Sequence, residues 1–334
     1  MFIWRKKIDL LISIGVIIIS SIAIYFAGNS FARASSAIGD YFKIPRDVKG
    51  ATFDAISSSM PELLVALYSV IVFKQFEVGI GTIAGSALFN LLVIPGICVF
   101  LAPLAFKVGK KVISRDALFY LISVFSLVVL IIYFKEWGII ISVILIGIYL
   151  VYLSQIAKHT KEYRNKNKAK NTRKGINIYK ELGIFVAMLG VIGLFTYLLT
   201  SQSINLSRIL GVSPIIIAFT ITAAATSIPD TVISAVNSKK GDIDGATSNV
   251  FGSNIFDISI GLGVPLLIYS IIKGSVKIVF DNLEIVLGLL FATILVIYFF
   301  GEDRILRKRE GIIMLFLYVL FVVYTILFSF GFFR

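Results

Sequence analysis

The sequence is poor in the residues from which soluble enzymes and metal centres are usually built. Only 15% of its 334 residues are charged, whereas a soluble domain has about a quarter. It has one cysteine, Cys98, so no disulfide can form within the chain, and one histidine, His159, so a cluster of histidine metal ligands is excluded. Nothing reads as a nucleophile–base pair, and we expect neither enzyme activity nor a cofactor.

Apolar residues are abundant in the same measure. Hydrophobic residues make up 58% of the chain and the mean hydropathy is +0.95. No soluble fold could bury this much apolar surface, so we expect the lipid bilayer to be the solvent. The formal net charge of +13 does not indicate a nucleic-acid partner, because the basic residues lie in short loops between apolar segments.

Ten segments are apolar and long enough to cross a bilayer, which requires about 20 residues in a helix. Their approximate limits are 8–28, 48–73, 77–104, 117–134, 137–157, 178–200, 213–238, 245–272, 283–301 and 311–333. The first resembles a signal peptide, but it continues to Gly28 without a convincing cleavage site, and we expect it to be retained. We therefore predict an all-α integral membrane protein with ten transmembrane helices.

Basic residues predict how this protein is oriented. The loops that join spans 1–2, 3–4, 5–6, 7–8 and 9–10 hold 23 of the 32 Lys and Arg residues. Since cytoplasmic loops are enriched in these residues, we place those loops, including the basic linker 158–177, in the cytoplasm. Both termini of this cell-membrane protein are then expected outside, although the basic cluster 5–7 taken alone argues for the opposite orientation.

The chain also repeats itself. Pro61-Glu62 is followed 168 residues later by Pro229-Asp230. Ser86 and Asn90 are followed 167 residues later by Ser253 and Asp257.

The repeat divides the chain into two halves. Its two copies lie in segments 50–90 and 218–257. We expect the halves, 1–157 and 178–334, to hold five helices each. An odd number of spans inserts the two halves with opposite polarity, and inverted repeats of this kind are typical of transporters that bind substrate near the midplane.

A proline follows a run of hydroxyl residues in each copy of the repeat. Proline inside a helix removes one N–H group and clashes with the carbonyl four residues back. We expect each broken helix to present a carboxylate, hydroxyls and freed carbonyls on one face. The carboxylates are Glu62 and Asp230, and the hydroxyls belong to Ser58, Ser59, Thr226 and Ser227.

The next helix of each copy adds further oxygen atoms. Ser86 lies four residues before Asn90, and Ser253 lies four before Asp257, so each pair shares a helix face. The combined set contains only oxygen ligands, which hard cations prefer, and calcium takes six to eight of them. Magnesium or manganese would accept similar atoms, so ligand type alone leaves the ion open.

Structural roles remain an alternative for these residues. A buried acid can serve as a hydrogen-bonding group, a proline as a simple kink, and Asn90 as a contact between helices. One charged residue at the bilayer centre costs about 3 kcal/mol, however, and such residues are generally functional. Two acids at matching positions, each directly after proline, favour function.

Three further acids have less defined roles. Asp54 lies two helical turns before Glu62, and we expect a salt bridge at the cytoplasmic mouth in preference to ion relay. Glu77 and Asp244 are 167 residues apart and are expected on opposite membrane faces. They either concentrate cations at the two entrances or start helices, where the dipole favours acids.

Together these residues resemble a known family. SSMPE with GSALFN, followed by ATSIPD with GSNIFD, resembles the two alpha-repeats of the calcium/cation antiporter superfamily. The Glu62 and Asp230 pairing is most similar to the potassium-dependent sodium/calcium exchangers. Departures from the family pattern occur at Ser57, Ala225 and Asp54.

The resemblance implies a role for each matching position. It implies that Glu62 and Asp230 bind calcium and that Ser86 and Ser253 complete sodium sites. It also implies that the remaining hydroxyls and the backbone carbonyls of Ala55 and Ala223 are ligands. Asp257 matches the position linked to potassium dependence.

The resemblance implies exchange of sodium for calcium by alternating access, with or without potassium, in which the first and sixth helices slide across the other eight. A proton/calcium exchanger of the same fold and a cation channel remain alternatives. The oligomeric state is open.

Overall fold

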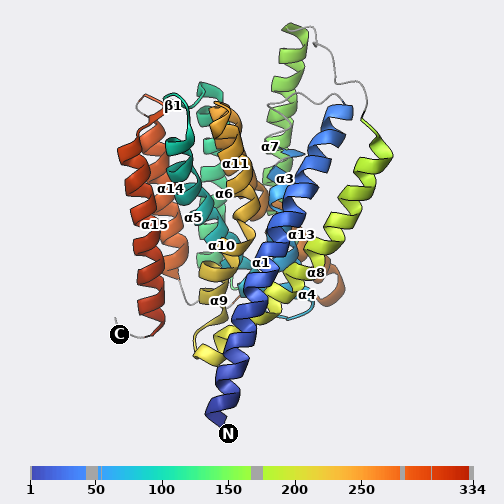
Figure 1. Cartoon of the computed structure of the whole chain (residues 1–334), viewed down its shortest axis with the longest axis vertical. Coiled ribbons are helices and arrows are strands. Elements are labelled where there is room, and N and C mark those ends of the chain that lie inside the picture. Colours follow the sequence, from blue (N-terminus) through green and yellow to red (C-terminus); the bar gives the residue numbers. More distant parts are fainter. Residues whose placement is uncertain are drawn as a thin grey trace.

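The computed structural model describes residues 2–42, 52–53, 55–166, 176–278, 283–301 and 303–330. Long helices run roughly side by side through this part of the chain and form one bundle (Figure 1). A polypeptide backbone inside a bilayer has no water to bond to, and a helix satisfies its backbone hydrogen bonds within one segment. Long apolar segments are therefore expected to form long helices.

The continuous long helices agree well with the apolar segments. They are α1 (Phe2–Tyr41), α5 (Phe76–Leu101), α6 (Leu118–Tyr133), α7 (Ile139–Lys166), α8 (Ile178–Leu210), α14 (Leu283–Gly301) and α15 (Lys308–Ser329). A π-helical turn, η2 (Val112–Ala117), leads directly into α6.

The remaining spans are interrupted. In the second half, α9 (Pro214–Ile217), the π-helical turn η3 (Ala218–Thr222) and α10 (Ala223–Thr226) precede α11 (Ile228–Lys239), and α12 (Ile243–Phe256) continues through η4 (Asp257–Gly261) into α13 (Leu262–Lys273). In the first half, α3 (Ala55–Ser58) precedes α4 (Met60–Ile71). The interruptions fall on the two copies of the repeat.

Within the described residues, eight helices are long and apolar enough to span a membrane, and a ninth span is the bent pair Pro214–Thr226 and Ile228–Lys239. The prediction of a multi-pass helical membrane protein is therefore confirmed. The predicted span 48–73 corresponds to the shorter α3 and α4, and its residues 48–51 and 54 lie outside the described residues.

Two helices are longer than their apolar segments. The segment predicted at 8–28 is part of α1, which continues to Tyr41, and α7 continues from its predicted end at residue 157 into the basic linker as far as Lys166. Polar residues such as lysine and arginine are good helix formers, so a helix need not end where the bilayer does. Apolar length gives the span but not the end of the helix.

Two short strand pairs depart from a purely helical fold. β1 (Phe106–Lys107) pairs antiparallel with β4 (Ile305–Leu306), and β2 (Glu136–Trp137) pairs antiparallel with β3 (Val276–Lys277). Each pair joins a loop of the first half to a loop of the second half. Pairs this short carry no periodic signal, so the sequence did not predict them.

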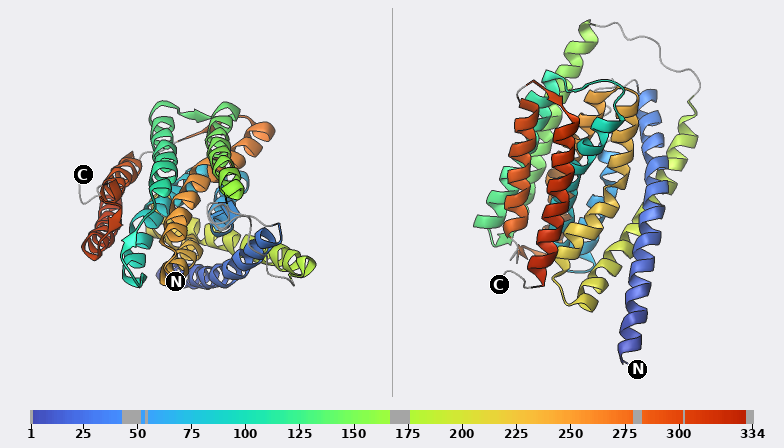
Figure 2. Two further views of the ribbon diagram at one scale, coloured as in Figure 1. Left: turned by 90° about the horizontal axis from the view of Figure 1, so that it is seen from above. Right: turned by 60° about the vertical axis from the view of Figure 1, so that its left-hand side comes forward.

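The helices differ in how deeply they are buried. In α5, 78% of the most apolar window is buried, against 17% in α8 and in α15, so α5 is central and the other two are peripheral. α1 and α8 pack along each other at one side of the bundle (Figures 1 and 2). α1 begins and α15 ends at the same end of the bundle.

Gly85 lets α5 approach the interrupted span of the second half. A Cβ atom added at Gly85 would lie 2.1 Å from the carbonyl oxygen of Phe219 and 2.7 Å from the Cβ of Ala223. Backbone cannot move aside as a flexible side chain can, so any larger residue would push the two repeats apart.

We expect Gly85→Ala to destabilise the protein by about 1–3 kcal/mol, the usual cost of overpacking a close contact. The control is Gly147→Ala on α7, where an added Cβ meets no atom within 4 Å. Thermal unfolding in detergent should show a lower midpoint for the first variant and an unchanged or higher one for the second. Equal midpoints for the two variants would contradict the close approach.

Candidate functional site

The two copies of the repeat are broken at equivalent places. Ser59 separates α3 from α4 with φ −86° and ψ 5°, and Ser227 separates α10 from α11 with φ −79° and ψ 0°. Pro61 and Pro229 then lie in the first turn of the following helix, where a missing N–H group costs nothing. Proline thus starts a new half-helix at each break, and the second span bends there by 42°.

Each break places a carboxylate at a helix N-terminus. Glu62 lies in the first turn of α4 and Asp230 in the first turn of α11, where the helix dipole stabilises negative charge. The half-helices that precede them end in carbonyl groups, which favour cations. The carbonyl of Ala55 accepts from Ser59 N at 3.0 Å and Ser58 Oγ at 3.2 Å.

The carbonyl of Ala223 has the equivalent surroundings. It accepts from Ser227 N at 3.0 Å and from Thr226 Oγ1 at 3.2 Å. The Thr226 hydroxyl also lies 3.1 Å from the carbonyl of Thr222, so it bonds to its own helix.

The carboxylate of Glu62 is bound by hydroxyls from both repeats. Its Oε1 accepts from Ser86 Oγ at 3.2 Å and from Ser227 Oγ at 3.5 Å. The Ser227 hydroxyl also donates to Ser86 Oγ at 2.8 Å. Ser227 belongs to the second repeat, so the acid of the first repeat is held partly by the second.

The carboxylate of Asp230 has a similar arrangement. Its Oδ1 accepts from Ser253 Oγ at 2.6 Å, and that hydroxyl lies 3.3 Å from Ser58 Oγ of the first repeat. Its Oδ2 accepts from Asn90 Nδ2 at 3.2 Å. The sequence predicted hydroxyls grouped with the acid of their own repeat, and Ser86 with Glu62 and Ser253 with Asp230 have this arrangement. The contacts of Ser227 with Glu62 and of Asn90 with Asp230 cross between the repeats and were not predicted.

A third acid lies near these two. Asp257 is fully buried at the start of η4 and interacts electrostatically with Glu62 and Asp230. The side chains of Ser59 and Ser86 interact with the carboxyl group of Asp257. Among the described residues, Glu62 Oε2 and Asn90 Oδ1 are buried oxygen atoms of this region that lack a hydrogen-bond partner. Buried polar atoms without partners are rare in proteins, and such a group is expected to bind something else.

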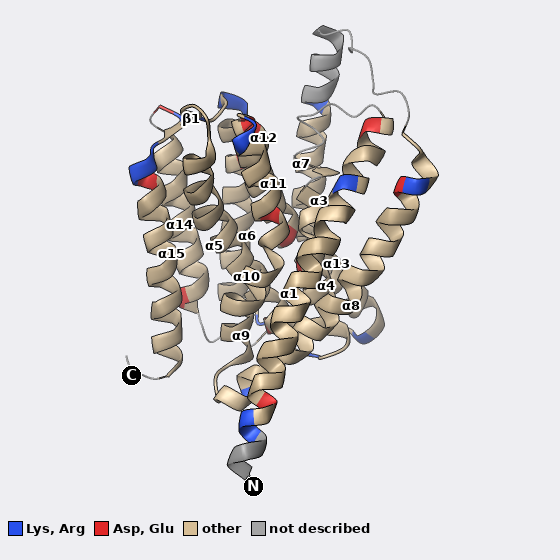
Figure 3. Cartoon of the chain, in the orientation of Figure 1, with Lys and Arg blue, Asp and Glu red and all other residues tan. Residues whose placement is uncertain are grey.

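This buried acidic region has no basic counterpart. The salt bridges found among the described residues involve Arg115 and Arg307 and none of the three site acids. Figure 3 shows acidic positions midway along the helices, with Lys and Arg gathered near the ends of the bundle. Oxygen donors with uncompensated negative charge favour a hard cation.

The site is not a preformed cluster of acidic metal ligands. Within the described part of the chain, no three Asp, Glu, His or Cys side chains are close enough to hold a metal by themselves. The carboxylates are instead interleaved with hydroxyls, amides and carbonyls. Such a mixed set can rearrange around ions of different charge.

Two residues of this region were not identified from the sequence. Asn249 Nδ2 lies 3.4 Å from Asp230 Oδ1 and 3.1 Å from Ser234 Oγ. Asn254 accepts from Asn90 Nδ2 at 3.1 Å and donates to the carbonyl of Ala87 at 3.1 Å. Their repeat equivalents are Thr82 and Ala87, so comparison of the two repeats gave no signal for them.

The three other predicted acids lie elsewhere or are not described. Glu77 lies in the first turn of α5 and Asp244 in the first turn of α12. Asp244 Oδ1 accepts from Gly109 N at 2.5 Å. These positions agree with acids that start helices, and Asp54 lies outside the described residues.

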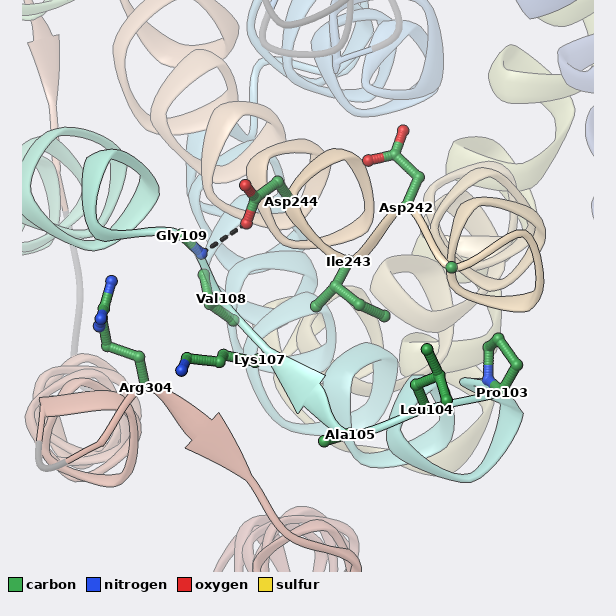
Figure 4. Close-up of a pocket in the computed structure, with 11 residues that line it drawn as sticks. Pro103, Leu104, Ala105, Lys107, Val108, Gly109, Asp242, Ile243, Asp244 and Arg304 are labelled. Carbon is green, nitrogen blue, oxygen red and sulfur yellow. Dashed lines mark hydrogen bonds between the residues drawn. The ribbon is translucent and has the colours of Figure 1, made fainter.

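Asp244 borders an open cavity of about 450 Å³ at one end of the bundle, formed by the loops before η2 and α12 together with Arg304. In Figure 4, Lys107 and Arg304 lie on one side of it and Asp242 on the other. Charges of both signs therefore line this cavity.

Comparison with known proteins agrees with the geometry. The sequence matches the sodium/calcium exchanger protein family over residues 12–156 and 180–327. The chain therefore belongs to that family, which confirms the family predicted from the sequence.

Several individual proteins are similar to it. An uncharacterized membrane protein of Methanocaldococcus jannaschii is 25% identical over 313 residues, covering 93% of this chain and 97% of that protein. Inner membrane protein YrbG of Escherichia coli is 26% identical over 267 residues, covering 78% and 81%. Human sodium/potassium/calcium exchanger 3 is 37% identical over 125 residues, covering 37% of this chain and 19% of that protein.

A solved structure shares the fold. The sodium-calcium exchanger NCX_Mj, soaked with sodium and strontium, superposes with a TM-score of 0.66 at 23% identity, covering 94% of this chain and 98% of that one.

We expect Asn249→Ala to weaken cation binding, because it removes a hydrogen bond from Asp230. Loss of an outer-shell partner commonly lowers metal affinity by about 10–100-fold. The matched control is Thr82→Ala, since Thr82 is the repeat equivalent and donates to the carbonyl of Val78 in its own helix. The calcium concentration that raises the unfolding temperature should increase for the first variant alone. An equal increase in both would contradict this role.

Proposed function

We propose that the chain is a secondary active antiporter that exchanges sodium for calcium across the cell membrane. The observation that carries this proposal is the pair of buried carboxylates, Glu62 and Asp230, each at a half-helix N-terminus and neither in a salt bridge with any described residue. Membership of the sodium/calcium exchanger family supports it.

We propose ligand roles for the residues of both repeats, supported by the oxygen atoms that surround the two carboxylates. Glu62 and Asp230 would share a calcium ion, with the hydroxyls bound to them rotating to face sodium when it replaces calcium. The proposed ligands that complete the set are Ser58, Ser59, Ser86, Asn90, Thr226, Ser227, Ser253 and Asp257, together with the carbonyls of Ala55 and Ala223.

Charge explains why exchange would be obligatory. The three acids offer up to three negative charges, and the salt bridges found among the described residues do not involve them. One calcium ion, or two to three sodium ions, would neutralise most of that charge. The empty site resists crossing the membrane, since a single buried charge already costs about 3 kcal/mol.

Sodium supplies enough free energy for this reaction. Expelling calcium against a roughly 10⁴-fold gradient and about 100 mV costs roughly 10 kcal/mol. Each sodium ion that enters down a tenfold gradient returns about 3.7 kcal/mol at the same potential. Two sodium ions return too little and three return enough.

We propose that the chain has ten spans arranged as inverted five-helix repeats, 1–157 and 178–334, joined by the linker 158–177. α3 and α4 would form the tenth span. The start of α1 and the end of α15 lie at one end of the bundle, and the end of α7 and start of α8 lie at the other. The distribution of basic residues then puts both termini outside and the linker in the cytoplasm.

Alternating access would use α1 and α8 as the moving pair. Polar side chains join these two helices, with Ser13 Oγ donating to Gln202 Oε1 at 3.0 Å and accepting from Asn205 Nδ2 at 2.9 Å. α1 meets the second repeat where Gly28 faces Pro229. Motion of α1 and α8 as one body would therefore uncover the break that carries Asp230.

Sodium-driven calcium uptake tests the proposal. We expect proteoliposomes loaded with sodium to take up radioactive calcium, and Glu62→Gln to reduce the initial rate to background, because the variant removes one of two shared charges. The control is Glu136→Gln on β2, an exposed acid far from the repeat breaks in sequence, which should transport at the normal rate.

Substantial uptake by Glu62→Gln would mean that the site is misplaced. Wild-type uptake that follows a pH gradient would indicate the proton-coupled alternative. Wild-type uptake that needs no counter-ion would indicate a channel.

Potassium co-transport has its own test, since Asp257 supplies a buried carboxylate close to Glu62 and Asp230. We expect external potassium to stimulate calcium uptake by the wild-type protein, and Asp257→Asn to abolish the stimulation while uptake continues. The rate at zero and at saturating potassium measures this directly. A wild-type rate that is independent of potassium would exclude co-transport.

A further inference from the structure

A buried carboxylate outside the proposed ion site is fully occupied by hydrogen-bond donors. Asp116, at the end of η2, has no exposed surface, and the Arg115 side chain beside it is 11% exposed. Arg115 Nε lies 2.5 Å from Asp116 Oδ1, and Arg115 Nη2 lies 3.0 Å from Oδ2. Tyr152 of α7 and Ser248 of α12 donate the other two hydrogen bonds, at 3.1 Å to Oδ1 and 3.0 Å to Oδ2.

The buried ion pair between Arg115 and Asp116 is not expected to add much to the folding stability of the protein. Burying an ion pair costs about as much solvation as the attraction returns, and apolar replacements are often equally stable. A buried ion pair can instead select one arrangement of the elements that pack around it. Here the four donors come from three elements, so the carboxylate fixes η2, α7 and α12 relative to one another.

α12, which is held by this carboxylate, carries two hydrogen-bond donors to Asp230. Ser248 is followed by Asn249, whose amide lies against Asp230 Oδ1, and Ser253 donates to the same oxygen. A small rotation or shift of α12 would move both donors away from Asp230.

Aromatic rings of three other helices also pack against α12. Phe251 packs against Tyr120 at 5.7 Å and Phe300 at 6.4 Å between ring centroids, and Phe256 packs against Tyr149 at 5.5 Å. Apolar packing is non-directional and tolerates small displacements, whereas a hydrogen bond to a fixed carboxylate requires a defined position.

We propose that Asp116 is a positioning residue for the ion site. It sets the position of α12 through Ser248, and α12 in turn presents Asn249 and Ser253 to Asp230. This inference rests on the proposed function, because it predicts an effect on cation affinity.

Two hydroxyl deletions at the same carboxylate provide the test. Ser248→Ala and Tyr152→Phe each remove one donor to Asp116 and leave the ion pair with Arg115 in place, so both variants are expected to fold. They differ in that Ser248 lies on α12 and Tyr152 does not. Ser248→Thr restores the hydroxyl and serves as the conservative variant.

The measurements are initial rates of sodium-driven calcium uptake at increasing calcium, together with thermal unfolding in detergent. We expect Ser248→Ala to raise the half-saturating calcium concentration about threefold, less than for a direct outer-shell partner, with a nearly unchanged maximal rate. Ser248→Thr and Tyr152→Phe should keep the wild-type value.

Two results would overturn the inference: an unchanged half-saturating concentration in Ser248→Ala, or an equal rise in Tyr152→Phe, which would indicate general loosening. Both are distinct from failure of the proposed function, because in that case the wild-type protein itself would show no sodium-driven uptake.

Discussion

The structure depends on keeping two carboxylates in the middle of an apolar bundle, where no described Lys or Arg forms a salt bridge with them. Glu62 and Asp230 are fully buried, and each lies in the first turn of a half-helix. Dipoles and hydroxyl donors lower the cost of this charge but do not cancel it. The breaks in both repeats and the close approach at Gly85 are explained by this requirement. In the proposed mechanism a bound cation offsets the remaining negative charge, so we expect ion binding and conformational change to be linked.

The two acids are not equivalent despite the repeat. Both oxygens of Asp230 accept hydrogen bonds, from Ser253 and Asn249 on one side and Asn90 on the other. Glu62 uses one oxygen, and its Oε2 remains without a partner among the described residues. Asp230 is therefore held in place by α12 and α5. Glu62 has fewer hydrogen bonds to its carboxylate and interacts electrostatically with Asp257.

Much of this architecture could be predicted from the sequence because it follows from strong local signals. Apolar length predicted the spans, and the repeated Pro-acid pairs predicted the breaks and their carboxylates. Asn249 could not be found in this way, because its equivalent is Thr82 and comparison of the two repeats shows no shared polar ligand at this position. Asp116 lies beside Arg115 near a predicted loop, and only the packing of η2, α7 and α12 shows that the pair is buried. The hydroxyls that cross between repeats depend on tertiary packing for the same reason.

The central claim is that sodium and calcium compete for one set of oxygen ligands around Glu62 and Asp230. The most direct test is the apparent dissociation constant for calcium, measured on purified protein at increasing sodium concentration. A shared site predicts that the logarithm of this constant rises with the logarithm of sodium concentration at a limiting slope of about two or more, because each displaced sodium ion adds one to the slope. A constant that does not change with sodium would contradict the account.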